Sequence, residues 1–125
     1  MNVLDSSAWL EYFANGPNAE IFAPVLERFD ELVVPTITIY EVFKRLLQQR
    51  DEDFSLTTMA KMYKGEIVAL DRLLAIRAAE LSSQHALPMA DSIILATSRE
   101  HGAVLWTQDA DFESIPDVNY IPKKK

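Results

Sequence analysis

The sequence predicts a three-layer α/β/α domain with four or five mostly parallel strands, and the alternation of two kinds of segment supports this fold class. Short apolar segments alternate with longer segments in which apolar residues recur every three or four positions, as in strands and helices. Parallel neighbours need long crossover connections, which helices normally supply. The length of 125 residues suffices for one core but not for two, so we expect a single domain over residues 1–125.

In the first half of the chain, apolar segments at residues 3–4 and 32–34 are the predicted strands. The predicted helices have apolar residues at helical spacing or a capping residue, and they cover residues 8–13, 22–29, 39–47 and 55–64. Pro24 lies inside the second helix and predicts a late start or a kink there. Ser55 is the predicted cap of the fourth helix, and Gly65 is its predicted stop.

The second half of the chain continues the alternation. Residues 67–70 form a predicted strand, and Asp71 caps a long helix that runs to about His85. Residues 90–101 form a helix with apolar residues on several sides, which predicts burial on most sides. The remaining predicted strands are residues 103–106 and an edge strand at residues 120–121.

Composition and charge narrow the function classes. The chain has no cysteine, which excludes a disulfide scaffold and a thiolate metal site and fits the reducing cytoplasm, our expected location. The first residues lack a basic region, and no apolar run approaches the ~18 residues of a membrane span, so we expect neither a signal peptide nor a membrane protein. The net charge of −7 argues against binding of a nucleic acid, because phosphate contacts need a basic surface. This argument weakens if the acidic residues are gathered at one site and not scattered over the surface.

Four acidic residues occupy equivalent places in the predicted fold. Asp5 follows the first strand, and Asp109 follows the fourth. Glu41 and Asp91 lie in the first turns of the helices that begin after the second strand and after Leu87-Pro88. The carboxyl ends of parallel strands share one edge of a sheet, where sites usually form, so we expect the four carboxylates to meet there.

Each acid also has an ordinary structural explanation. Asp5 can cap the first helix, and Thr38 with Glu41 matches a capping box. Asp91 can favour the positive end of a helix dipole, and Asp109 can be a turn residue. Four such roles that coincide at one edge of the sheet are less expected than a shared function, so we interpret the set as a site.

Crowded carboxylates repel one another, and a hard divalent cation relieves that repulsion. With no cysteine and only two histidines, the ligands favour Mg²⁺ or Mn²⁺ over zinc, and we expect Asp5, Asp91 and Asp109 to bind it. Such ions support phosphodiester hydrolysis. Ser7 and Thr107 stand beside two of these acids, where they can bind a water or phosphate oxygen or can act as helix or turn caps.

Four segments of the chain resemble the signature segments of PIN-domain ribonucleases, and more narrowly those of VapC-type toxins: residues 3–7, 38–42, 87–97 and 105–112. The resemblance implies Mg²⁺- or Mn²⁺-dependent endoribonuclease activity in a toxin–antitoxin pair. It carries the acids of the family onto Asp5, Glu41, Asp91 and Asp109. Asp111 lies in the fourth segment too, and family members vary in which acid there faces the metal.

The resemblance also implies a cognate VapB-type antitoxin and a homodimer. For the dimer we consider the first helix, with Trp9, Tyr12 and Phe13, and the strongly apolar third helix, although core packing is the ordinary explanation of their apolar surface. We hypothesise that some of the basic residues outside the terminal lysines frame the groove and hold the RNA backbone, although a solvated helix face explains them equally well: Lys44, Arg45, Arg50, Lys61 and Lys64.

Other functions remain open. A haloacid-dehalogenase-like phosphatase needs Asp-x-Asp after its first strand, where this chain has Asp5-Ser6-Ser7. A receiver domain would use Asp71, which reads better as a helix cap, and a Toprim site needs a glutamate where Asp5 stands. An RNA-processing PIN nuclease outside a toxin–antitoxin pair, or a catalytically silent PIN-fold binding module, is the alternative within the same fold.

Overall fold

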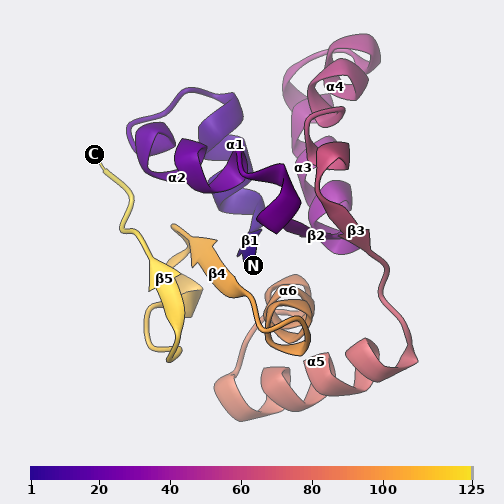
Figure 1. Cartoon of the computed structure of the whole chain (residues 1–125), viewed down its shortest axis with the longest axis vertical. Coiled ribbons are helices and arrows are strands. Elements are labelled where there is room, and N and C mark those ends of the chain that lie inside the picture. Colours follow the sequence, from indigo (N-terminus) through magenta and orange to yellow (C-terminus); the bar gives the residue numbers. More distant parts are fainter. Residues whose placement is uncertain (125) are drawn as a thin grey trace.

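The computed structural model describes residues 1–124 as an α/β/α arrangement (Figure 1). The strands are short and parallel, and they are β1 (Asn2–Leu4), β2 (Val33–Pro35), β3 (Glu66–Val68), β4 (Val104–Thr107) and β5 (Val118–Tyr120). The α-helices are α1 (Ser6–Phe13), α2 (Ala19–Leu26), α3 (Thr36–Gln49), α4 (Glu52–Met59), α5 (Arg72–His85) and α6 (Met89–Glu100). Three 3₁₀ turns complete the described elements: η1 (Phe29–Glu31), η2 (Met62–Lys64) and η3 (Ala110–Phe112).

The strands form two hydrogen-bonded groups, β1-β4-β5 and β2-β3, and every described pair is parallel. A parallel bridge between Asn2 and Leu32 joins the two groups. The order across the sheet is therefore β3-β2-β1-β4-β5, with β1 in the middle. This arrangement confirms the predicted fold class, and it brings the carboxyl ends of β1 and β4 to the same edge.

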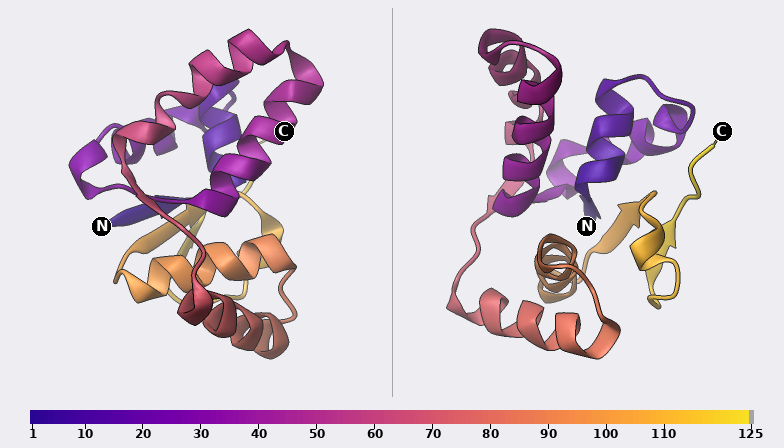
Figure 2. Two further views of the ribbon diagram at one scale, coloured as in Figure 1. Left: turned by 90° about the vertical axis from the view of Figure 1, so that its right-hand side faces the viewer. Right: turned by 180° about the vertical axis from the view of Figure 1, so that it is seen from behind.

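The sheet separates two apolar cores, because successive residues of a strand face opposite sides. Val3 belongs to the core beneath α6, whereas Leu4 belongs to the core beneath α1 and α2. Helices α1 to α4 lie on one side of the sheet, and α5 and α6 lie on the other (Figures 1 and 2). The predicted layers are thus present.

Helix α6 is the most deeply buried helix among the described residues, as its sequence predicts. All residues from Asp91 to Ser98 are buried, because the sheet covers one side of α6 and α5 covers another. Asp91 therefore begins a helix whose position is fixed by the core. None of the helices described is long and apolar enough to cross a bilayer.

One local prediction is wrong: Asp51, not Ser55, caps α4, because its side chain accepts a hydrogen bond from Phe54 N, and Ser55 is buried inside the helix. Of the two outcomes expected at Pro24, a late start or a kink, the late start does not occur, since α2 begins before Pro24 and includes it. The capping-box alternative fails, because Thr38 lies inside α3 and Pro35 occupies the cap position.

Candidate active site

Asp5 lies at the carboxyl end of β1 and is almost completely buried. Asp5 Oδ1 accepts hydrogen bonds from Ala8 N at 3.0 Å and from Ser7 Oγ at 2.7 Å. Asp5 Oδ2 accepts one from Thr107 Oγ1 at 2.5 Å, because β4 lies beside β1 in parallel register. Asp5 caps α1 as predicted, yet its second oxygen is also fixed by a neighbouring strand, so the capping role alone does not explain its placement.

Asp91, Asp109 and Asp111 form the acidic cluster of the site. One carboxylate oxygen from each lies within 4.8 Å of the others, close enough for all three to contact one cation. Asp91 comes from the first turn of α6, and the other two come from the turn after β4. Asp109 also caps that turn, because its Oδ1 accepts a hydrogen bond from Asp111 N at 2.9 Å. Asp109 is therefore both the cap of this turn and a member of the acidic cluster.

The cluster affects the protonation of two aspartates. Burial, together with the charges of Asp109, Asp5 and Asp111, raises the pKa of Asp91 to about 8. Burial also raises the pKa of Asp5 to about 6, although hydrogen bonds from Thr107, Ser7 and Ala8 lower it. Two carboxyl groups with raised pKa values at one sheet edge indicate a functional site, because the fold keeps acidic side chains buried close to one another there.

Glu41 lies in the second turn of α3 and is half-buried. Its Oε1 accepts a short hydrogen bond from Ser6 Oγ in α1, which fixes the glutamate against the helix that Asp5 caps. The capping-box explanation fails for Glu41, because the predicted partner Thr38 is inside the helix and its hydroxyl has no partner among the described residues. Glu41 shares no hydrogen bond with the aspartates.

Ser7 and Thr107 link the acids to the backbone of the β4 turn. Thr107 Oγ1 accepts a hydrogen bond from Asp109 N at 2.9 Å, and Ser7 Oγ accepts one from Gln108 N at 3.1 Å. The two hydroxyls therefore organise Asp5 and the turn that carries Asp109. Their predicted contact with a substrate or water stays a prediction.

A buried Asn18 and its partner Gln108 support the same turn. Asn18 Nδ2 donates hydrogen bonds to Gln108 Oε1 and to the carbonyl oxygen of Pro122, each at 3.0 Å. The sequence analysis missed both residues, because Asn18 follows Gly16-Pro17 and has the appearance of an ordinary turn residue. Only the fold shows that it is completely buried.

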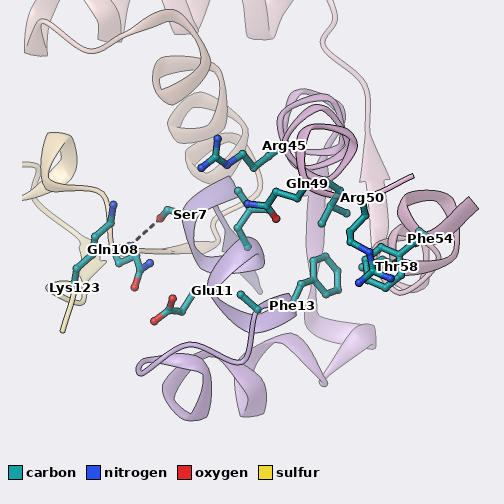
Figure 3. Close-up of a pocket in the computed structure, with 13 residues that line it drawn as sticks. Ser7, Glu11, Phe13, Arg45, Gln49, Arg50, Phe54, Thr58, Gln108 and Lys123 are labelled. Carbon is teal, nitrogen blue, oxygen red and sulfur yellow. Dashed lines mark hydrogen bonds between the residues drawn. The ribbon is translucent and has the colours of Figure 1, made fainter. Parts of the chain in front are cut away.

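A groove of about 510 Å³ lies between α1, α3 and α4 (Figure 3), and none of the clustered aspartates lines it. Arg45 and Arg50 line it, and Ser7, which also lines it, donates a hydrogen bond to Asp5. The other predicted basic residues lie elsewhere: Lys61 donates to Tyr12 Oη, Lys64 lies over the ring of Phe29, and Lys44 lines a smaller hollow beside Glu41. The five basic residues therefore do not form one surface.

The donor set fits a hard divalent cation. The clustered oxygens are all carboxylates, and burial, followed by the charges of neighbouring aspartates, raises the pKa of Asp91, a cost that a bound cation would relieve. Cysteine is absent from the sequence, and neither histidine belongs to the cluster. Asp91, Asp109 and Asp111 are the residues placed to bind such an ion, with Asp5 beside them.

Fold and site together define an α/β/α domain with an acidic centre at the carboxyl edge of a parallel sheet. The model of the PIN domain family matches residues 3–118, so the chain belongs to the PIN domain family.

Solved structures agree with this assignment. A chain of a toxin–antitoxin complex from Klebsiella pneumoniae is 27% identical, with 94% of this chain and 95% of that chain covered at a TM-score of 0.77. VapC20 of Mycobacterium tuberculosis, a sarcin–ricin loop cleaving toxin, is 15% identical, with 98% and 100% covered at a TM-score of 0.78. FitAcB of Neisseria gonorrhoeae is 24% identical, with 98% of each chain covered at a TM-score of 0.64. No curated protein sequence matches the chain.

Proposed function

We propose that the chain is a Mg²⁺- or Mn²⁺-dependent endoribonuclease and the toxin of a toxin–antitoxin pair. The observation that carries this proposal is the cluster of Asp91, Asp109 and Asp111, whose oxygens lie within 4.8 Å of one another beside the buried Asp5. Membership of the PIN domain family and the similarity to a Klebsiella pneumoniae toxin–antitoxin chain support it.

Different residues of the chain have different roles at the proposed site. A bound divalent cation supplies charge neutralisation for the phosphate and lowers the pKa of water. Thr107 and Ser7 donate hydrogen bonds to Asp5 and so favour its ionised form. Asp91 must give up a proton before it can bind a cation near neutral pH, because its pKa is raised to about 8.

Glu41 has a different role in this scheme. Glu41 lies outside the clustered aspartates and accepts a hydrogen bond from Ser6. It also lines the smaller hollow that Lys44 lines. We propose that Glu41 orients a water or a sugar hydroxyl of the substrate at this hollow. The Ser6 bond places the carboxylate before substrate arrives, which reduces the ordering cost of the step.

A fluorogenic RNA assay tests the proposal directly. We expect cleavage with Mg²⁺ or Mn²⁺, none with EDTA, and none for Asp91→Ala with either metal. Cleavage that persists in EDTA would contradict the metal dependence. An absence of cleavage on single-stranded and structured RNA would favour a catalytically silent binding module.

We infer a VapB-type antitoxin as partner from the similarity to toxin–antitoxin chains. Three acids within 4.8 Å create a strongly negative potential, which a basic side chain of the antitoxin would complement. A lysine or arginine there also favours the ionised forms of Asp5 and Asp91, whose pKa values burial raises. Inhibition through this contact would be lost when the basic residue is removed.

We propose a homodimer through a surface that differs from the predicted one. Trp9 is completely buried, and Tyr12 and Phe13 pack against the same core, so α1 offers little free apolar surface. Four exposed apolar side chains follow one another from β3 to the start of α5, and they are Ile67, Leu70, Leu73 and Ile76, each 44–59% exposed. We propose that this segment contributes to the dimer interface, because exposed apolar surface commonly marks a protein–protein contact.

A further inference from the structure

The residues that follow β5 lie against the candidate site. Ile121 N donates a hydrogen bond to Thr107 O at 2.8 Å, so the chain continues along β4 beyond the last strand. The carbonyl oxygen of Pro122 then accepts a hydrogen bond from Asn18 Nδ2 at 3.0 Å. Residues 121–124, which we name the basic arm because they end in Lys123-Lys124, are thus attached at two successive points.

Asn18 is suited to anchor the basic arm because it is completely buried and bound from several sides. Its Nδ2 also donates to Gln108 Oε1, and its backbone N–H donates to Glu11 Oε2 at 2.8 Å. Gln108 N in turn donates to Ser7 Oγ, which donates to Asp5. The arm therefore has a fixed place relative to the acidic centre.

The basic arm contributes Lys123 to the lining of the groove between α1, α3 and α4. Lys123 and Gln108 line it on one side of α1, and Arg45 and Arg50 line it on the other (Figure 3). Ser7 lies between the two sides, at the end of the groove nearest Asp5. Cations from two distant parts of the sequence thus line one groove, and its lining residue Ser7 is hydrogen-bonded to Asp5.

These cations have no acidic partner among residues 1–124. The ion pairs found there join Arg28 to Glu31 and Arg77 to Glu80, both outside the groove. Within the groove, Arg45 donates to the neutral Gln48. Arg50 lies 3.8 Å above the ring centroid of Phe54, and Lys123 is exposed.

The groove holds one acid, Glu11, whose Oε2 already accepts the bond from Asn18 N. The charge of the groove is therefore positive in a protein whose net charge is −7.

We propose that the basic arm is a phosphate-binding element, and that Lys123 and Lys124 bind the RNA backbone opposite Arg45 and Arg50 while the scissile phosphate lies at the aspartates. This inference rests on the proposed ribonuclease function. Cations on both sides of a groove match the charges that a nucleic-acid strand presents on successive phosphates. A protein segment is the less favoured occupant, because three cations would oppose its own basic residues and the one acid is already bonded.

The test compares RNA binding by the Lys123→Ala/Lys124→Ala variant and by wild type. Binding of a fluorescein-labelled single-stranded RNA of mixed sequence is measured by anisotropy in EDTA, over a range of salt concentrations. Loss of two phosphate contacts should flatten the slope of log affinity against log salt by about 1.4, and should weaken binding by roughly 25-fold at about 0.1 M salt. The matched control, Arg28→Ala/Arg77→Ala, removes the same charge outside the groove and should keep the wild-type slope.

A second pair of variants separates charge from fold. Lys123→Arg/Lys124→Arg should restore both the affinity and the slope, because an arginine binds phosphate as well as a lysine does. A wild-type slope for the alanine variant, or an equal loss in the control, would overturn the proposal. Weakened binding of the antitoxin with unchanged RNA binding would overturn it too, since the groove would then belong to a protein partner.

Failure of the proposed ribonuclease function can be distinguished from failure of the proposal about the basic arm. If wild type neither binds nor cleaves RNA with Mn²⁺, the ribonuclease proposal itself fails. If wild type does both and the basic arm changes neither, only the arm proposal fails.

Discussion

Replacing Asp91 with asparagine should stabilise the metal-free protein while it removes activity. The side chain keeps its size, but it can no longer carry the charge that Asp109, Asp5 and Asp111 repel. The rise of the Asp91 pKa from 3.8 to about 8 corresponds to an upper limit of roughly 5–6 kcal/mol at pH 8, at about 1.36 kcal/mol per pKa unit. Rotation of the side chain toward solvent reduces this value, and we expect a gain of about 2–3 kcal/mol.

The sign of the pH dependence follows from the same pKa. Because the pKa of Asp91 is higher in the folded protein, the unfolded chain releases its proton first as the pH rises. Wild-type stability should therefore fall between pH 4 and pH 8, the range bounded by the pKa values of 3.8 and about 8. The gain from Asp91→Asn should shrink to about a third at pH 5, where the folded carboxyl is still protonated.

Urea unfolding in EDTA at pH 5 and pH 8 measures both effects. Asp30→Asn is the matched control, since Asp30 is exposed in η1 and outside the acidic cluster. Added Mg²⁺ should stabilise wild type by about 1–3 kcal/mol and the Asp91→Asn variant by less, because a ligand that binds the folded state raises its stability. A variant that is less stable than wild type at pH 8, or a gain that does not grow from pH 5 to pH 8, would refute the reasoning.

The remaining predictions concern activity and assembly. Asp5→Ala or Asp91→Ala should abolish metal-dependent RNA cleavage with the circular dichroism spectrum unchanged, and wild-type rates in either variant would exclude that residue from the site. Thr107→Val removes a hydrogen bond that lowers the pKa of Asp5, so the acid limb of the pH–rate profile should move up by roughly one pH unit; an unmoved limb would contradict this role. Light scattering should show a dimer for wild type. The Leu73→Lys variant should dissociate this dimer, and the control variant Leu56→Lys, on α4, should not. A 14.2 kDa species for wild type would contradict the dimer. Inhibition by the antitoxin should disappear when the C-terminal lysine or arginine of the antitoxin is removed. Inhibition that survives this truncation would contradict the proposed contact between that basic side chain and the acidic cluster.

Periodicity and capping residues were sufficient to predict the elements of the fold. The alternation of Val3 and Leu4 between two cores, and the buried faces of α6, follow directly from apolar spacing. The prediction of a helix boundary failed where two nearby residues can each cap the same helix. Ser55 and Asp51 both suit a helix cap, and the chain uses Asp51, which leaves Ser55 free to bond back to the Asp51 carbonyl.

Side-chain partners were harder to predict than the backbone. The sequence placed Asp5, Asp91 and Asp109 at one edge, but it left open whether Asp109 or Asp111 faces a metal, and the structure gathers both with Asp91. The hydrogen bond from Asn18 to Pro122 joins residues far apart in the chain, and no local pattern contains it. Trp9 likewise could not be assigned to core or surface without knowledge of which helices cover α1.

The acidic centre and the groove are built from parts of the molecule with very different tolerance to change. Asp5 and Asp91 belong to buried elements, where a substitution alters core packing or charge burial. Arg45, Arg50 and Lys123 are exposed, and replacing a surface side chain usually changes stability by less than about 0.5 kcal/mol. If the groove binds RNA as proposed, substitutions at its walls would change RNA preference at little cost in stability, whereas substitutions of the buried aspartates would disturb both the fold and the proposed cleavage.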